Sequence, residues 1–386
     1  MSASSVYSSL KIVQVCTSRA WGGMEMHHVE LSREQHARGA DVQVICARDS
    51  RTAHALAETD LRDRCHFWPP AGYFQPAVIL RARRFFRQLK PDVIHVHYSR
   101  DLWWLVPALI FLPQSVLVLS KHIGTQKPKR DFLHRFLYSR VDRLIAISRV
   151  IRENIIATHP VPEQKVVLVH HGIDLERYAP EKIDRIAVRE KLGYTQDHFV
   201  IGITGRLQPS KGYLELLAAA QRLRTDYPEN RYLLVGEASV GDRKQANEVY
   251  RFIEEKGQTD IVQCTGFRRD IPEMLAAMDL FVFPSHAEAF GLVVIEAMAM
   301  AKAIIASNSD GIPDIINDGK TGLLVPPRSV EPLTRAIRRL RNDAELRERL
   351  GRQARSRAQE YFTKDRMMKN LLQVYQNALA ERSRHG

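Results

Sequence analysis

Short runs of β-branched and other apolar residues alternate along the chain with longer segments whose apolar positions recur every three or four residues. Such an alternation is typical of βαβ units, in which helices cover both faces of a parallel sheet. The pattern therefore predicts an α/β protein. The apolar runs predict strands at residues 11–16, 41–47, 93–97, 116–120, 144–148, 166–169, 199–205, 232–236, 261–264, 280–284 and 303–307.

The alternation is interrupted once, between residues 172 and 193, where the sequence becomes charged and contains proline. We interpret this interruption as a domain boundary, because the alternation starts afresh at residue 199. The sequence thus predicts an N-terminal Rossmann-like domain over 1–180, a C-terminal Rossmann-like domain over 181–362 and a helical tail over 363–386. In doubly wound sheets, ligands bind outside the carboxyl ends of the strands, so functional residues are expected in the loops that follow them.

The composition supports two folded domains and excludes several other classes. The chain has 386 residues, of which 45% are hydrophobic and 26% charged, unlike disordered or collagen-like chains. Its apolar runs are too short to cross a bilayer, and residues 1–9 lack the pattern of a signal peptide. The four cysteines lie far apart in sequence, which favours neither disulfides nor a zinc site and suits a reducing cytoplasm.

The formal net charge of +13 implies an acidic partner, which nucleic acid, an anionic membrane or a phosphorylated substrate would supply. Most of the excess lies in residues 81–152, where fifteen Lys and Arg stand against four Asp and Glu. Such basic stretches are often only the solvated faces of ordinary helices. Beside apolar and aromatic residues, however, they also favour an anionic membrane or a phosphorylated glycolipid. The basic residues singled out for this membrane or acceptor patch are Arg81, Arg84, Lys127, Lys129 and Arg130.

Two glycines, Gly22 and Gly23, lie between the first predicted strand and a helical segment. Their bare N–H groups and the positive end of the helix would accept a phosphate, although such a pair is more often a tight turn. The loop is not a GxGxxG fingerprint, and no acidic residue follows at the spacing that dinucleotide-binding proteins show. An NAD-binding function is therefore disfavoured.

The equivalent loop of the second domain carries two cations, Arg206 and Lys211, directly before an apolar-periodic helix. Cationic donors at the start of a helix are suited to a diphosphate, because their charge adds to that of the helix end. The loop is not a Walker A motif, since Ser210 precedes the lysine. The alternative is that both cations are ordinary solvated side chains.

A second loop of this domain contains Glu288, and Gly291 then begins an apolar helix that carries Glu296. A carboxylate at each end of this segment suits an elongated ligand with hydroxyl groups at two places and a phosphate at the helix start. Burying Glu296 among apolar neighbours is costly without a partner. The alternative is that Glu296 pairs with a core arginine and that Glu288 is a surface cap.

Histidines end two predicted strands of the first domain, at residues 95–97 and at His122. Most histidines in such places are structural, but His122 is followed by the loop Ile123-Gly124-Thr125, of the kind that contacts ligands. No cluster has metal-ligand spacing, and no GxSxG or Cys–His signature is present. Metal and acyl-enzyme chemistry are therefore disfavoured.

Together these motifs resemble the retaining glycosyltransferases of family 4, whose GT-B fold has two Rossmann-like domains facing a central cleft. The resemblance covers nearly the whole chain and implies a C-terminal helix that crosses back to the N-terminal domain. It rests on Gly22-Gly23, on the segment from Glu288 to Glu296, and on residues 91–97 (PDVIHVH), 145–148 (IAIS), 171–174 (HGID), 205–212 (GRLQPSKG), 311–316 (GIPDII) and 318–327 (DGKTGLLVPP).

The resemblance implies a role for each candidate residue. Arg206 and Lys211 would bind the diphosphate of a nucleotide sugar, and Glu296 would bind its ribose. Glu288 and His122 would act on the transferred sugar as the catalytic residues. The remaining donor contacts would come from Gly22, Gly23, Gly266, Phe267, Arg268, Phe290, Gly291 and Leu292.

The resemblance also implies the chemistry and the partners. Transfer would retain the anomeric configuration by a front-face displacement, without a metal ion or cofactor. The donor would be a UDP-sugar, and the acceptor a lipid-linked or lipopolysaccharide-type glycolipid. We therefore expect a cytoplasmic protein at the inner face of the cytoplasmic membrane.

Two other functions are compatible with parts of the sequence. A non-hydrolysing sugar-nucleotide epimerase can share the two-domain architecture, but it should not combine Glu288 and Glu296 with Arg206 and Lys211. A nucleic-acid-binding protein could use the basic stretch electrostatically, although no helix-turn-helix or aromatic-rich RNA motif supports that function. The sequence favours the glycosyltransferase.

Overall fold

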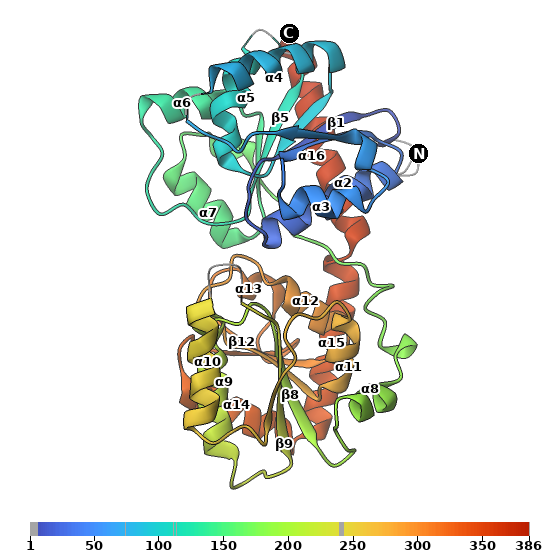
Figure 1. Ribbon diagram of the computed structural model, residues 1–386, viewed down its shortest axis with the longest axis vertical. Helices are drawn as coiled ribbons and strands as arrows, with labels where there is room; N and C mark the ends of the chain where they lie inside the picture. Colours follow the sequence, from blue (N-terminus) through green and yellow to red (C-terminus); the bar gives the residue numbers. More distant parts are fainter. Residues whose placement is uncertain (1–6, 74, 111, 113, 239–242, 386) are drawn as a thin grey trace. The chain divides into compact units, whose positions relative to one another are not determined.

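The computed structural model describes residues 7–73, 75–110, 112, 114–238 and 243–385, and the chain forms two compact units (Figure 1). The first unit comprises Met1–His170 together with Met367–Gly386, and the second comprises His171–Arg366. Each unit contains one sheet of parallel strands. The two predicted Rossmann-like sheets are therefore confirmed.

The first sheet has seven strands in the order β3-β2-β1-β4-β5-β6-β7. The chain order reverses between β1 and β4, which is the topological switch point where ligands bind in such sheets. Strand β3 was not predicted, because this short edge strand contains a histidine and lacks a continuous apolar run. The strands are β1 (Lys11–Cys16), β2 (Asp41–Ala47), β3 (Cys65–Trp68), β4 (Val93–Val96), β5 (Val116–Lys121), β6 (Arg143–Ala146) and β7 (Val166–Leu168).

The second sheet has six strands in the order β10-β9-β8-β11-β12-β13. Its switch point lies between β8 and β11, because the chain order reverses there. Strand β13 was not predicted, because its three residues are flanked by Gly322 and Pro326, which indicate a loop. The strands are β8 (Phe199–Thr204), β9 (Asn230–Val235), β10 (Val262–Cys264), β11 (Leu280–Phe283), β12 (Ala303–Ser307) and β13 (Leu323–Val325).

Helices lie on both sides of the first sheet, with α4 and α5 on one side and α2 and α3 on the other (Figure 1). Among the described residues, no helix is long and apolar enough to span a membrane. The helices of the first unit are α2 (Gly23–Ala37), α3 (Arg51–Ala57), α4 (Pro76–Leu89), α5 (Leu102–Leu109), α6 (Phe132–Ser139) and α7 (Arg149–Thr158). Those that follow are α8 (Arg185–Lys191), α9 (Tyr213–Leu223), α10 (Arg243–Glu255), α11 (Ile271–Ala277), α12 (Leu292–Ala299), α13 (Ile312–Ile315), α14 (Val330–Asn342), α15 (Ala344–Tyr361) and α16 (Lys364–His385).

Helix α4 has the amphipathic form that its sequence predicts. Its buried residues include Val78, Ala82 and Phe86, while Arg81 and Arg84 are exposed. The guanidinium of Arg81 lies 4.9 Å from the ring centroid of Trp68. This helix therefore covers the sheet in the ordinary way, and its arginines lie on the outer face.

The segment after β7 packs on the second unit, so the units divide after His170, whereas the sequence places the division after residue 180. The Ile173 amide donates to the carbonyl of Phe362 at 2.9 Å. A Cβ atom on Gly172 would lie 2.2 Å from the carbonyl oxygen of Thr363, so only glycine permits this approach. Contacts of this kind depend on the tertiary fold, which the local sequence pattern does not reveal.

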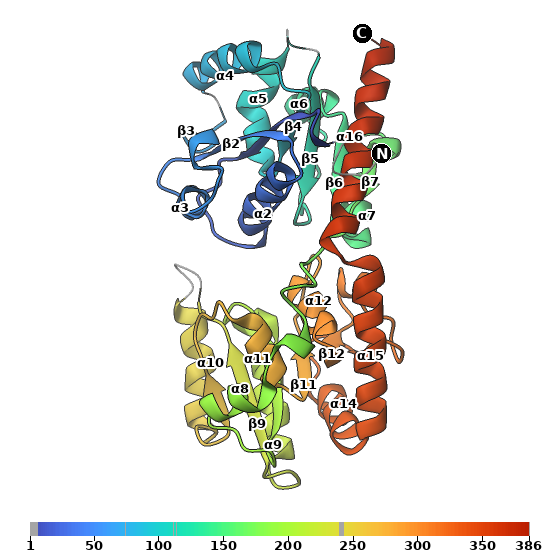
Figure 2. The same ribbon diagram turned by 90° about the vertical axis from the view of Figure 1, so that its right-hand side faces the viewer.

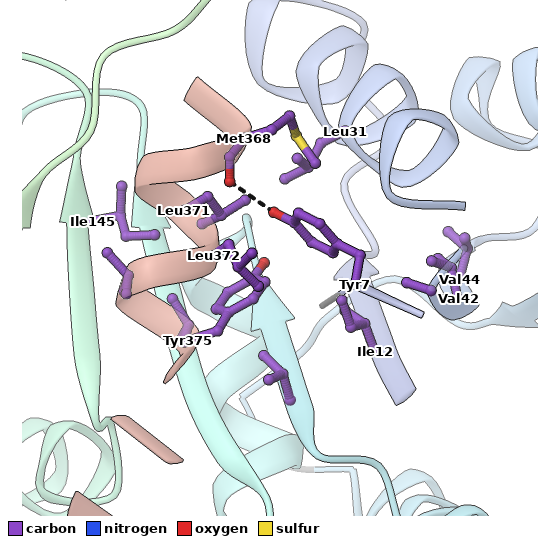
Figure 3. Close-up of a cluster of buried hydrophobic side chains, with 14 of the residues drawn as sticks. Tyr7, Ile12, Leu31, Val42, Val44, Ile145, Met368, Leu371, Leu372 and Tyr375 are labelled. Carbon is purple, nitrogen blue, oxygen red and sulfur yellow. Dashed lines mark hydrogen bonds between the residues drawn. The ribbon is translucent and has the colours of Figure 1, made fainter. Parts of the chain in front are cut away.

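The C-terminal helix α16 packs on the first unit from Met367 onward, alongside the sheet (Figure 2). Figure 3 shows its residues Met368, Leu371, Leu372 and Tyr375 among buried side chains of the N-terminal region. The hydroxyl of Tyr7 donates to the carbonyl oxygen of Met368 at 2.9 Å (Figure 3). The predicted return of the C-terminal helix to the N-terminal domain is therefore confirmed.

Candidate active site

Two loops of the second unit meet at the switch point of its sheet, one after β8 and one after β11. The His286 amide donates to the carbonyl of Ser210 at 2.9 Å, which ties the two loops together. At Gly212, φ is +83° and a Cβ atom would lie 2.2 Å from the carbonyl oxygen of Pro284. Glycine is thus required for the close approach that brings the two loops into one site.

Lys211 and Glu288 form an ion pair across these loops, with 2.7 Å between Lys211 Nζ and Glu288 Oε2. Both side chains are partly buried, at 14% and 20% exposure. Arg206 is exposed and forms no ion pair within the described ranges. The structure therefore brings Lys211 and Glu288 together, and it overturns the alternative in which Glu288 is a simple cap.

Glu296 lies in the second turn of α12, and Gly291 caps this helix with φ at +107°. The hydroxyl of Tyr178 donates to Glu296 Oε1 at 2.7 Å. Burial raises the pKa of Glu296 to about 7, while the hydrogen bond from Tyr178 lowers it in part. The partner of Glu296 is thus a tyrosine and not the core arginine of the alternative reading. Sequence reasoning missed Tyr178, because nothing in its local pattern points to a residue over a hundred positions away.

Phe290 directly precedes Gly291, the cap of α12. The ring of Phe290 is buried, 5.4 Å from His171 and 6.2 Å from Phe362 between ring centroids. The first N–H groups of any helix lack partners within the helix. A contribution of Phe290 and Gly291 to ligand binding would therefore come from their main chain, whereas the side chain of Leu292 is partly exposed.

The predicted base-binding loop follows β10 at the same carboxyl edge of the sheet. The Gly236 amide after β9 donates to the Gly266 carbonyl at 3.0 Å, which fixes the loop. The side chain of Phe267 is 60% exposed, and Arg268 Nε donates to Asp270 Oδ1 at 2.8 Å. An exposed aromatic ring beside an oriented guanidinium can stack on a planar base.

In the first unit, the two-glycine loop opens α2 as predicted, with Gly22 as the cap. The Gly22 amide donates to Glu25 Oε2 at 3.0 Å, and Ser18 Oγ donates to Glu25 Oε1 at 2.6 Å. The Gly22 amide is thus engaged by the glutamate of the first turn. The proposed contact of Gly22 and Gly23 with a phosphate stays a prediction, and it would require the Gly22 amide to exchange partners.

His122 lies in a cluster of imidazoles that the sequence pattern only partly reveals. His122 Nε2 is 3.2 Å from His97 Nδ1, and both residues are buried. His27 and His28 of α2 add ring contacts to His97. Burial lowers the pKa of His97 and of His122 well below the usual value, and the neighbouring histidines lower both further. His122 is therefore a neutral hydrogen-bonding group at pH 7.

A chain of hydrogen bonds fixes which nitrogen of these imidazoles carries the proton. Gln14 Nε2 donates to Gln35 Oε1 at 2.6 Å, so Gln14 Oε1 is the acceptor that faces His97 Nε2 at 2.8 Å. Neutral His97 thus carries its proton on Nε2 and accepts on Nδ1. His122 must then donate through Nε2.

The same chain continues to the C-terminal helix. Gln35 Nε2 donates to the hydroxyl oxygen of Tyr375 at 3.0 Å, and this hydroxyl donates to His95 Nδ1 at 2.7 Å. His95 Nε2 then donates to Ser120 Oγ at 2.8 Å. A residue of α16 therefore helps to hold the imidazole cluster, although it lies far from His122 in sequence.

We expect Tyr375→Phe to lower the free energy of unfolding by about 2–3 kcal/mol, because it leaves buried polar atoms of Gln35 and His95 without a partner. The matched control Tyr7→Phe removes one hydrogen bond from the same core and should cost about 1 kcal/mol. Urea unfolding followed by circular dichroism measures both values. An equal loss in the two variants would contradict the hydrogen-bond chain.

No group of three or more His, Cys, Asp or Glu that could hold a metal ion is found in the part of the chain that the structure describes.

Comparisons with known proteins agree with this arrangement. A family model described as "Glycosyltransferase Family 4" matches residues 21–177, and one described as "Glycosyl transferases group 1" matches residues 184–357. D-inositol 3-phosphate glycosyltransferase from Saccharomonospora viridis is 29% identical over 93% of this chain and 90% of its own length. The enzyme of the same name from Streptomyces bingchenggensis is 31% identical over 75% of this chain and 67% of its own.

A structural comparison extends the likeness to the fold. The crystal structure of Anabaena HepE in complex with UDP-glucose superposes with a TM-score of 0.80. The two chains are 22% identical, and the match covers 96% of this chain and 100% of that one. The GT-B fold expected from the sequence is therefore shared by this chain.

Proposed function

The chain belongs to the retaining glycosyltransferases of family 4, and on this premise we propose that it transfers a glycosyl group from a UDP-sugar to a hydroxyl group of a phosphorylated acceptor. The choice of nucleotide is supported by HepE, whose crystal structures contain UDP and UDP-glucose. The observation that carries the proposal is the pairing of Lys211 with Glu288 beside α12 and Glu296, at the switch point of the second sheet.

Each donor-site residue would contact a different part of the UDP-sugar. Arg206 and Lys211 would bind the diphosphate, and the start of α12 would donate backbone hydrogen bonds to it. Glu296, oriented by Tyr178, would accept hydrogen bonds from the ribose hydroxyls. Glu288 would accept from the transferred sugar, which places the bond to be broken between the two carboxylates and next to the Lys211 ammonium.

The chemistry would follow from this placement. The bond between the anomeric carbon and the diphosphate oxygen breaks, and the acceptor oxygen forms its bond on the same face. The acceptor proton passes to the departing diphosphate. Lys211, Arg206 and the helix start would stabilise the charge that grows on the leaving group, which is the largest rate contribution such a site provides. Neutral His122 would hydrogen-bond the transferred sugar.

The finer identity of the acceptor is proposed from two kinds of support. The relatives named above act on an inositol phosphate by name, which favours a phosphorylated acceptor. On α6, Phe132, Leu133 and Phe136 are 80%, 49% and 41% exposed, close in sequence to Lys127 and Arg130. This exposed apolar face beside cations supports peripheral binding at the inner face of the cytoplasmic membrane and a lipid-linked acceptor. The lipopolysaccharide assignment rests on the sequence resemblance alone.

The nucleotide is tested by a thermal-shift comparison of UDP, GDP and ADP. We expect UDP at about 100 times its Kd to add about 2.7 kcal/mol of stability and to raise Tm by about 5–10 °C, with smaller shifts for the other two. Equal shifts for all three would contradict a uridine-specific site. Product analysis with UDP-glucose then separates the classes, because an epimerase would return an isomeric UDP-sugar and a transferase releases UDP.

We also expect UDP binding to tighten as the pH rises from 6 to 8. The pKa of Glu296 is raised to about 7, so its carboxyl group is mostly protonated at pH 6 and mostly ionised at pH 8. Only the ionised form accepts hydrogen bonds from both ribose hydroxyls, which gives up to about tenfold tighter binding. Calorimetric titration of wild type and Glu296→Gln measures this change. The variant should keep only the pH dependence of the phosphate, and an unchanged profile would contradict the ribose assignment.

A further inference from the structure

A pocket of about 290 Å³ opens on the first unit, next to the carboxyl ends of β4 and β5. One wall follows β4 and includes Arg100 of the short 3-10 helix Ser99–Asp101 and Trp103 of α5. Another wall is the loop after β5, with Lys127 and Lys129, and Tyr73 completes the lining together with residues of α6. The pocket is thus at the same sheet edge as His122, which directly follows β5.

The charge in this pocket is unbalanced. In the described ranges, Arg100, Lys127 and Lys129 form no ion pair with a carboxylate. The nearby Asp131 is engaged by α6, since it accepts from the His134 amide at 3.1 Å and its Oδ2 lies 2.5 Å from His134 Nδ1. Burial lowers the pKa of Lys129 and Arg100 lowers it further, while the Asp131 carboxylate raises it in part. A bound anion would relieve this repulsion.

A further cation lies at the end of β5. Lys121 is 6% exposed and has no ion-pair partner in the described part of the chain. Burial lowers its pKa to about 8, with an added contribution from Lys129. Burying a lysine without a counter-charge is costly. Binding of an anion would offset the cost of burying Lys121, because the anion supplies the counter-charge that the cluster of cations lacks.

The cations and the aromatic wall are held by the fold rather than by loose surface loops. The Thr17 amide and Trp104 Nε1 each donate to Asp101 at 3.0 Å, which anchors the helix that carries Arg100. The Arg100 guanidinium lies 5.7 Å from the Tyr73 ring centroid, and the Tyr73 and Trp103 rings are 5.2 Å apart in an edge-to-face arrangement.

The opposite wall is held as well, because the Lys129 amide donates to the carbonyl of Thr158 at 2.7 Å. Hydrogen bonds thus hold both walls of the pocket in place within the first unit. A site held in this way can bind an anion with defined geometry.

We propose that this pocket binds the phosphate ester group of the acceptor, with the ring or chain that carries it against Trp103 and Tyr73. The inference rests on the proposed glycosyl transfer and names the substrate class of its acceptor side. A phosphate monoester carries nearly two negative charges and has three acceptor oxygens. It therefore matches one arginine and two lysines better than a carboxylate, which carries a single negative charge. A concave pocket of this volume also suits one headgroup rather than a flat membrane surface.

Direct binding tests this site without relying on turnover. Calorimetric titration would use enzyme saturated with UDP, so that phosphate cannot occupy the diphosphate site, and D-inositol 3-phosphate with unphosphorylated inositol as its control. A parallel flotation arm would use phosphatidylcholine vesicles containing phosphatidic acid, against vesicles containing phosphatidylglycerol. The variants are Arg100→Gln and Lys129→Gln, and the matched control is Arg62→Gln, an exposed arginine of the same unit outside the pocket.

We expect the phosphorylated probe to bind, and each pocket variant to weaken binding by about tenfold or more while Arg62→Gln leaves it unchanged. Dependence of the soluble probe on Arg100 and Lys129 would support the site and identify a soluble acceptor. The same dependence for phosphatidic acid vesicles alone would support it with a lipid headgroup as the source. Absence of binding to both probes, or binding that all three variants reduce equally, would overturn the proposal.

UDP binding by the same variants, and UDP-glucose hydrolysis by the wild-type enzyme, separate this failure from failure of the proposed function. The pocket variants should keep the wild-type affinity for UDP, because none of the residues assigned to UDP lines the pocket. An enzyme that neither binds UDP nor cleaves UDP-glucose would contradict the donor assignment, whatever the outcome at the pocket.

Discussion

Lys211→Ala should lower kcat/KM for the UDP-sugar by about 10²–10³-fold and should weaken UDP binding by at least about tenfold. The Lys211 ammonium lies 2.7 Å from Glu288 Oε2 at the switch point of the second sheet, where the diphosphate is expected. Its removal takes away a charge that stabilises the leaving group, and it leaves the Glu288 carboxylate uncompensated near the same phosphates. Both effects act in the same direction, so the loss should exceed that of any other single cation.

The loss must be separated from unfolding. The Lys211–Glu288 pair is partly exposed, and such pairs contribute about 0–1 kcal/mol to stability, so Tm should change little. Lys191→Ala removes an exposed lysine from α8 of the same unit and should retain full activity. Coupled assays of UDP release and titration with UDP measure the two expected losses. Wild-type activity in Lys211→Ala would contradict the site assignment.

The donor half of the site could be predicted from the sequence because its chemistry is encoded locally. Lys211 directly precedes a helix, and Glu288, Gly291 and Glu296 lie within one loop and the helix that follows it. Both segments follow buried apolar strands, and the carboxyl-end rule then places them at one edge of the sheet. The spacing of residues was sufficient in these cases, since no distant part of the chain had to be known.

Other features depend on contacts between distant segments. Tyr178 reaches Glu296, and Tyr375 of α16 reaches His95, but a tyrosine in either local sequence looks like an ordinary core residue. The glutamate that engages the Gly22 amide was missed for another reason. A Gly pair before a helix predicts a free anion site only when no acidic residue occupies the first turn, and Glu25 does. The third helical residue therefore needs to be considered before such a loop is assigned to phosphate.

Glu288→Gln should separate turnover from nucleotide affinity. We expect kcat to fall by about 10²-fold, because glutamine keeps the shape of the side chain but lacks the negative charge that accepts hydrogen bonds from the sugar and holds Lys211 in place. UDP contains no transferred sugar, so its affinity should stay within about fivefold of wild type. The effect on kcat should therefore be much larger than the effect on the Kd of UDP.

Glu296→Gln is the matched comparison for this separation, since it makes the same chemical change eight positions along the chain. That variant should weaken UDP binding, because Glu296 is assigned to the ribose, which UDP and the UDP-sugar share. Titration with UDP and steady-state assays on both variants give a two-by-two comparison. If Glu288→Gln lost UDP affinity while Glu296→Gln lost only turnover, the assignments of the two carboxylates would have to be exchanged. The expected order follows from the proposed roles, because the ribose and the transferred sugar lie on opposite sides of the diphosphate, and Glu288 precedes α12 whereas Glu296 lies in its second turn.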